Sequence, residues 1–117
     1  MTNRYFIRSS DVKPYSPPNH SKTLNRRLIG PEENGSKRFE LIIGELEVGG
    51  EAHKHTHKDI DQGFYILEGR CLIMVGSEEE ELCPGMAVYI PAGIEHRLSV
   101  IESLKILVFY SPPLCGN

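Results

Sequence analysis

Glycine and proline punctuate this chain densely, and the sequence between them reads as short runs of alternating polarity. The 117 residues include 11 Gly and 8 Pro, and the runs between them are rich in β-branched and aromatic residues, which favour strands. No window keeps the 3.6-residue period of an amphipathic helix. Many short strands at regular spacing are typical of a β-sandwich or a closed β-barrel. We expect strands over residues 37–48, 52–57, 62–67, 71–75, 87–90, 95–100 and 104–110.

The N-terminal third has a different composition from the rest of the chain. Residues 13–34 contain four prolines together with several Asn and Ser, a composition that favours extended, irregular backbone. We therefore expect residues 1–36 to form an extended arm that packs on the barrel or on a partner subunit. Residues 5–7 could add an edge strand. Residues 37–117 then form a single barrel domain, as the chain length suggests.

Composition excludes several classes of protein. Apolar residues make up 39% and charged residues 25%, and the formal net charge is −3. The chain lacks the basic excess of a nucleic-acid binder, and a weakly acidic surface is not attracted to an anionic membrane. No run has the length of a signal peptide or a membrane span, so we expect a cytoplasmic protein.

Three cysteines without a C-x-x-C spacing do not indicate disulfides or a thiolate zinc cluster. Cys71 is predicted to be a small core residue, and Cys83 and Cys115 to be surface or turn thiols. The acidic run at residues 78–81 is interpreted as a solvated hairpin tip whose charges protect a sheet edge.

Histidines are clustered in a way that indicates metal binding. His53, His55 and His57 alternate along one predicted strand, so the period of two directs all three to the same face. His96 lies on another predicted strand. Imidazoles from two facing strands can converge on one ion, at nitrogen–metal distances of about 2.0–2.1 Å. An H-x-H pair alone is often polar surface, so the surrounding residues decide the interpretation.

Two segments, GGEAHKHTHKDIDQGFYILEG and GMAVYIPAGIEHRLSV, resemble the two motifs of the cupin superfamily. The family patterns are G-x5-H-x-H-x3-4-E-x6-G and G-x5-P-x-G-x2-H-x3-N. The resemblance covers residues 49–100 closely and is greatest to small single-domain bacterial members. It implies an all-β double-stranded β-helix, or jelly-roll barrel, with one divalent metal ion near one end. It assigns His55, His57, Gln62 and His96 as the ligands.

Two positions depart from the family pattern. Gln62 stands where glutamate is usual, and Val100 stands in place of asparagine. Four neutral ligands leave the full +2 charge on the ion, which lowers the pKa of a bound water further and argues against oxygen activation. The candidate ions are Zn, Ni, Fe, Mn, Co and Cu. Alternatively, Gln62 does not ligate and instead hydrogen-bonds a bound water or the substrate.

Other side chains are candidates for the pocket or the chemistry. His53 and Glu95 are candidates to move a proton, although His53 could equally be a rim residue in water. Asp61 should point away from the metal on a regular strand. The substrate pocket is predicted to be lined by apolar residues that lie on the same face as the ligands. A tyrosine hydroxyl and an arginine are further candidates, because a guanidinium group could pair with an anionic substrate. Together the candidates are Phe64, Ile66, Leu98, Val100, Tyr89 and Arg27, and core packing alone also explains the first four.

These observations favour a small metalloenzyme. We expect it to act on a small oxygen-rich molecule, such as a sugar acid, a keto acid or a dicarbonyl, by isomerase, lyase or cyclase chemistry without oxidation. Some small cupins with glutamine at this position open or linearise unsaturated uronates, and this resemblance favours a non-redox reaction. The alternatives are an Fe(II)-type dioxygenase and a non-catalytic module that binds a sugar or another small molecule. An apolar outer face that includes Tyr65, Leu67, Leu107 and Phe109 predicts a homodimer.

Overall fold

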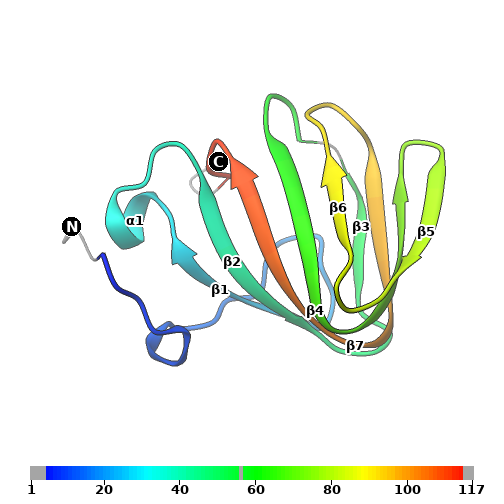
Figure 1. The fold of residues 1–117 in the computed structure, drawn as a ribbon, viewed down its shortest axis with the longest axis horizontal. Coiled ribbons are helices and arrows are strands. Elements are labelled where there is room, and N and C mark those ends of the chain that lie inside the picture. Colours follow the sequence, from blue (N-terminus) through cyan, green and yellow to red (C-terminus); the bar gives the residue numbers. More distant parts are fainter. Residues whose placement is uncertain (1–4, 56, 115–117) are drawn as a thin grey trace.

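The structure is a computed structural model, and it describes residues 5–55 and 57–114, with side chains at 52–55 excluded. Within these ranges, seven strands form one antiparallel sheet that curls over into a barrel open at its upper end in Figure 1. No helix among the described residues is long and apolar enough to cross a membrane. The elements are η1 (Ser9–Asp11), β1 (Thr23–Ile29), α1 (Pro31–Asn34), β2 (Glu40–Leu46), β3 (Glu51–His55), β4 (Asp61–Val75), β5 (Glu78–Leu82), β6 (Ala87–Ile90) and β7 (His96–Ser111).

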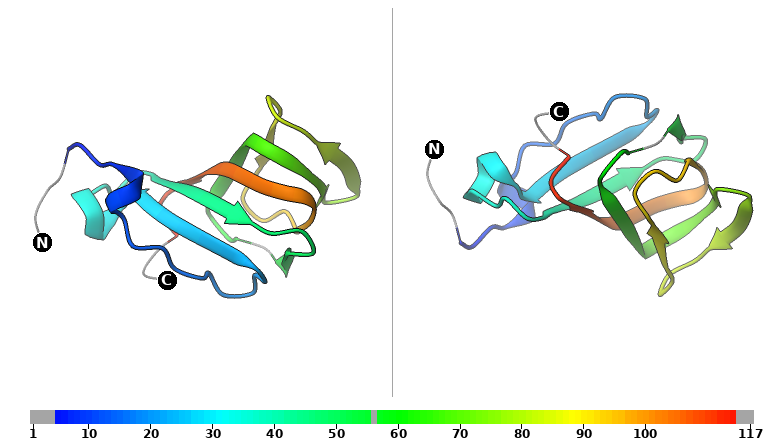
Figure 2. Two further views of the ribbon diagram at one scale, coloured as in Figure 1. Left: turned by 90° about the horizontal axis from the view of Figure 1, so that it is seen from below. Right: turned by 90° about the horizontal axis from the view of Figure 1, so that it is seen from above.

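Two long strands, β4 and β7, run through both layers of the barrel and bend at its base (Figures 1 and 2). The register between them shifts around Gly69, which has a φ of +86°. A Cβ atom at Gly69 would lie 2.0 Å from the carbonyl oxygen of Ser103, so only glycine fits there. Because β7 bends, His96 at its start and Tyr110 near its end both lie at the open end of the barrel.

Alternation along β4 and β7 sorts the side chains into an interior and an outer face. Gln62, Phe64 and Ile66 are buried, whereas Tyr65 and Leu67 between and beyond them are exposed, as the period of two predicts. Cys71 is fully buried and Cys83 is exposed, as predicted; Cys115 lies outside the described residues. The core consists of Ile42, Leu46, Phe64, Ile66, Cys71, Ile73, Leu82, Ile90, Leu98, Val100, Leu104, Ile106, Val108 and Tyr110.

The N-terminal segment holds a strand that the sequence did not predict. Residues 23–29 form β1, which pairs with β2 at the edge of the sheet. Tyr15 pairs with Asn25 as an isolated bridge, so residues before β1 also lie against the sheet. The expected edge strand at residues 5–7 is not formed. The prolines of residues 13–34 flank β1 and do not interrupt it, which is why composition alone misplaced this segment.

Other boundaries differ from the prediction because bends within two long strands were interpreted as breaks between strands. The two runs expected at 62–67 and 71–75 are one strand, β4, and the runs at 95–100 and 104–110 are one strand, β7. The acidic residues 78–81 belong to β5, which pairs with the second half of β4. Their side chains are exposed, and Leu82 turns inward. The charges therefore do lie on the solvent side of an edge strand, as expected.

Candidate metal centre

Three segments carry the proposed ligands to the open end of the barrel. Gln62 is the second residue of β4, His96 is the first residue of β7, and His57 lies in the loop between β3 and β4. The backbone of β3 places His55 opposite His96 in the antiparallel register. The side chains of His53 and His55 lie outside the described residues, so their part in the site stays a prediction.

His57 and His96 come together although they are far apart in sequence. Their ring centroids are 5.5 Å apart, and the rings are inclined at 46°. The carbonyl oxygen of His57 accepts a hydrogen bond of 3.0 Å from the backbone N–H of Gly93, which ties the two histidine-bearing segments together. Two imidazoles on one tetrahedral ion would hold their centroids roughly 5 Å apart, given metal–nitrogen distances of about 2.1 Å. The observed separation fits a shared ion.

The tautomer of His96 suits metal binding. Its Nδ1 lies 3.1 Å from the carbonyl oxygen of Ile94. A carbonyl oxygen only accepts, so Nδ1 carries the hydrogen, and the lone pair of the neutral ring is on Nε2. Backbone carbonyls play this orienting role at many metal-bound histidines. The Nε2 atoms of His96 and His57 are both buried, and the whole His96 residue is only 2% exposed.

Gln62 presents a buried oxygen. Its Nε2 donates a hydrogen bond of 3.3 Å to the hydroxyl oxygen of Tyr110. Its Oε1 is buried and has no hydrogen-bond partner among the described residues. An unsatisfied buried acceptor costs about 1–3 kcal/mol, so the position calls for a cation or a donor. This observation is the strongest evidence that a group fits between Gln62 and the histidines.

Tyr110 belongs to the site and was not predicted from the sequence. It packs edge-on against His57, with centroids 5.7 Å apart and an interplanar angle of 85°. Burial raises the pKa of the Tyr110 hydroxyl strongly, and the neighbouring Tyr15 and Glu40 raise it further. The hydroxyl therefore stays protonated at neutral pH. Tyr110 continues the buried alternate positions of β7, which are Leu104, Ile106 and Val108. The two-residue period of this strand could therefore have identified it from the sequence.

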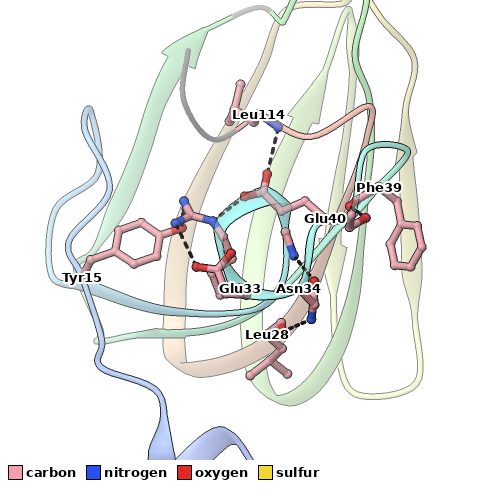
Figure 3. Close-up of polar contacts among 10 residues, drawn as sticks. Tyr15, Leu28, Glu33, Asn34, Phe39, Glu40 and Leu114 are labelled. Atoms are coloured by element: carbon pink, nitrogen blue, oxygen red, sulfur yellow. Dashed lines mark hydrogen bonds and ion pairs between the residues drawn. The ribbon is translucent and has the colours of Figure 1, made fainter. Parts of the chain in front are cut away.

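Electrostatically, the described part of the site is neutral. No three His, Cys, Asp or Glu side chains among the described residues lie together. Glu40 pairs with Tyr110 in the register of β2 and β7 and is fully buried. Its carboxylate forms an ion pair with Arg27 and accepts a 2.8 Å hydrogen bond from the backbone N–H of Leu114 (Figure 3). A divalent ion beside Gln62 would therefore keep most of its charge.

The structure buries some of the other predicted residues in the core and exposes others on the surface. Phe64, Ile66, Leu98 and Val100 are buried in the core below the site. Glu95 and Asp61 are exposed, and Asp61 accepts a 2.9 Å hydrogen bond from the backbone N–H of Ala92. Asp61 thus points away from the interior, as expected.

Tyr89 and Arg27 do not line the inside of the barrel. Tyr89 is 64% exposed, because β6 turns its neighbour Ile90 inward opposite Gln62. Arg27 is engaged by Glu40, donates a 2.9 Å hydrogen bond to Tyr15 and lies over the Tyr15 ring. Its guanidinium group is thereby committed within the protein, which explains why it does not project into the mouth.

Comparison with known proteins identifies the family. The model of the cupin domain matches residues 42–110. The chain belongs to the cupin family. An uncharacterized protein of Methanocaldococcus jannaschii is 32% identical over 104 residues, 87% of this chain and 82% of that protein. An uncharacterized Streptomyces coelicolor protein is 41% identical over 69 residues, and the match spans 58% of this cupin and 65% of the relative.

Solved structures confirm the jelly-roll architecture predicted for this cupin. An RmlC-like cupin from Shewanella frigidimarina aligns with a TM-score of 0.84 and 16% identity, covering 97% of this chain and 95% of the other. The polyketide cyclase RemF from Streptomyces resistomycificus aligns with a TM-score of 0.78 and 27% identity, covering 96% and 80%. The quercetin 2,3-dioxygenase of Bacillus subtilis is 27% identical over 70 residues, which is 60% of this chain and 21% of that enzyme. Cupin relatives often bind a metal.

Proposed function

We propose that this cupin binds one divalent transition metal ion through His55, His57, His96 and Gln62, and that it is an enzyme. The ion is one of Zn, Ni, Fe, Mn, Co and Cu. The observation that carries the proposal is the buried, unsatisfied Oε1 of Gln62. Gln62 contacts Tyr110, which packs against His57, and His57 lies beside His96. Nitrogen donors with one amide oxygen suit a transition metal better than calcium or magnesium.

The chemistry that we propose is non-redox. When bound, the ion would supply Lewis acidity toward a carbonyl or carboxylate oxygen. The neutral donors leave charge on the ion, which favours a small, oxygen-rich and anionic or enolisable substrate, such as a sugar acid, keto acid or dicarbonyl. Below the site, Phe64 and Leu98 are buried and apolar, so they exclude water from the reacting end of the substrate.

The groups that we propose for proton transfer are Glu95 and His53, both predicted from the sequence. Glu95 is exposed and adjoins His96, and it could exchange protons with solvent. His53 is on the same strand as His55, two residues earlier. Tyr110 keeps its hydroxyl hydrogen and lies against His57, so it can donate a hydrogen bond to a bound oxygen. The similarity to RemF, a polyketide cyclase, supports a reaction without oxidation.

A dioxygenase is the second candidate, and the similarity to quercetin 2,3-dioxygenase favours it. The two functions differ in one measurable respect. A dioxygenase consumes oxygen when the protein is reconstituted with Fe(II) under air and given a dicarbonyl or flavonoid substrate. We expect no oxygen uptake above that of the metal-free protein. Uptake that depends on both iron and substrate would replace the non-redox proposal. A protein that binds sugar acids without changing them would be a binding module.

Metal binding itself is tested by elemental analysis of the purified protein. We expect about one equivalent of transition metal in the wild type and a loss of at least tenfold in His57→Ala and His96→Ala, because each removes one nitrogen ligand. His20→Ala is the matched control, since His20 lines a separate groove with Lys22 and Glu47. Equal metal content in all four proteins would overturn the proposal.

A further inference from the structure

A hydrogen bond between Gln62 and Tyr110 connects the proposed ligand set to the far end of β7. The two residues are 48 positions apart in sequence and directly opposite each other in the register of β4 and β7. Gln62 is 4% exposed and Tyr110 is 8% exposed. The Nε2 of Gln62 lies 3.3 Å from the hydroxyl oxygen of Tyr110, so this contact is shielded from water.

The direction of this bond determines which end of the amide is free. An amide has one accepting oxygen and one donating nitrogen. In the structure the nitrogen donates to Tyr110, which leaves the oxygen as the free, buried end. The reversed amide would leave its NH2 group as the free end, and a donor cannot bind a cation. The orientation of Gln62 is therefore decisive for ligation.

We infer that Tyr110 is a positioning residue: its hydroxyl accepts the Gln62 hydrogen bond and so keeps Oε1 available to the metal. This inference rests on the proposed function. Tyr110 also packs against the edge of His57, so one side chain orients two of the proposed ligands. A glutamate at position 62 would need no such partner, because both of its oxygens accept. The need for Tyr110 is thus specific to glutamine.

A double-mutant cycle tests this dependence. The probe is Zn(II) alone, and its affinity is measured by competition with a chromophoric chelator in the wild type, Y110F, Q62E and the double variant. We expect Y110F to weaken binding about tenfold, as loss of an orienting partner commonly does. In the Q62E background the same change should weaken binding less than twofold. Tyr65→Phe, on the exposed face of β4, is the control.

Each outcome of the cycle has a definite meaning. A loss confined to the Gln62 background supports the inference. Equal losses in both backgrounds would show that Tyr110 contributes only packing, and no loss in either would show that it does not orient the amide. Both results overturn the inference and leave the metal site intact. A wild type that binds no Zn(II) would instead overturn the proposed function together with this inference.

A measurement on the unsubstituted protein covers the case in which Y110F fails to fold. In the Zn(II)-loaded wild type, NMR detects which hydrogens lie near the side-chain amide hydrogens of Gln62. We expect nuclear Overhauser effects to the ring hydrogens of Tyr110. Effects to the ring hydrogens of His57 or His96, without any to Tyr110, would show the reversed amide and overturn the inference.

Discussion

Arg27 of β1 donates its Nε hydrogen to the fully buried carboxylate of Glu40, the first residue of β2. The other carboxylate oxygen of Glu40 accepts the backbone N–H of Leu114, so this one side chain ties β1 and β2 to the C-terminal segment (Figure 3). Tyr15 brings the N-terminal residues into the same cluster through its hydroxyl and its ring. An arginine that could have met the substrate therefore serves the fold.

Removing this arginine should destabilise the protein strongly. Arg27→Met leaves the buried Glu40 without its cation, and breaking a buried pair in this way costs about 3–5 kcal/mol. Urea unfolding of the metal-free protein measures the loss. Arg26→Met is the matched control, because Arg26 pairs with the exposed Glu45 on the surface and should cost less than about 1 kcal/mol. Equal losses in the two variants would contradict a structural role for the Arg27–Glu40 pair.

A carboxylate at position 62 should bind divalent ions more tightly than the native amide. Gln62→Glu adds a negative charge in a buried layer, where Coulomb attraction is stronger than in water. We expect Zn(II) affinity to rise at least tenfold, measured by chelator competition. Asn19→Asp adds the same charge at an exposed turn and should change affinity by less than twofold. An unchanged affinity in Gln62→Glu would show that residue 62 does not ligate.

The sequence predicted the parts of the fold that depend on local alternation. β6 has the predicted bounds, Ala87–Ile90, and Gln62 shares the buried face with Phe64 and Ile66 as the period of two requires. Cys71 is buried as expected for a free cysteine. The motif spacing also placed His57 and His96, which lie together in the structure. These features follow from residues close in sequence or from fixed spacings along a strand.

The features that were missed depend on contacts between distant segments. Tyr110 meets Gln62 because the two residues are directly opposite each other in the register of β4 and β7, although they are 48 positions apart in sequence. β1 is an edge strand whose pairing with β2 cannot be read from its own residues. Arg27 appeared free for a substrate because no local pattern shows that a buried carboxylate lies 13 residues later.

Burial of Cys71 should make stability fall at alkaline pH. Burial, with a smaller effect of Glu81, raises the pKa of its thiol to about 11 from a reference of 9.0. Above pH 9 the unfolded chain releases this proton and the folded chain keeps it, so unfolding is favoured as pH rises through 11. We expect the wild type to lose about 2 kcal/mol between pH 9 and pH 11 relative to Cys71→Ala. Parallel stability profiles for the two proteins would contradict this.

The outer face of the sheet should mediate a dimer. Tyr65, Leu67 and Phe109 are each more than a third exposed, and Phe39 stacks on Phe109 with centroids 5.4 Å apart. An exposed cluster of this kind on a small domain is typical of an interface, and a second copy would present the same surface about a two-fold axis.

Light scattering on a sizing column tests this assembly. The wild type should have twice the 13.2 kDa mass of one chain, and Tyr65→Lys should yield the monomer, because a charge in the centre of a two-fold contact is repeated by the partner. Glu79→Lys, which changes charge on the exposed hairpin of β5, should leave the mass unchanged. A wild type that elutes with the mass of one chain would mean that these aromatic side chains remain in water. A dimer that survives Tyr65→Lys would place the contact on another face.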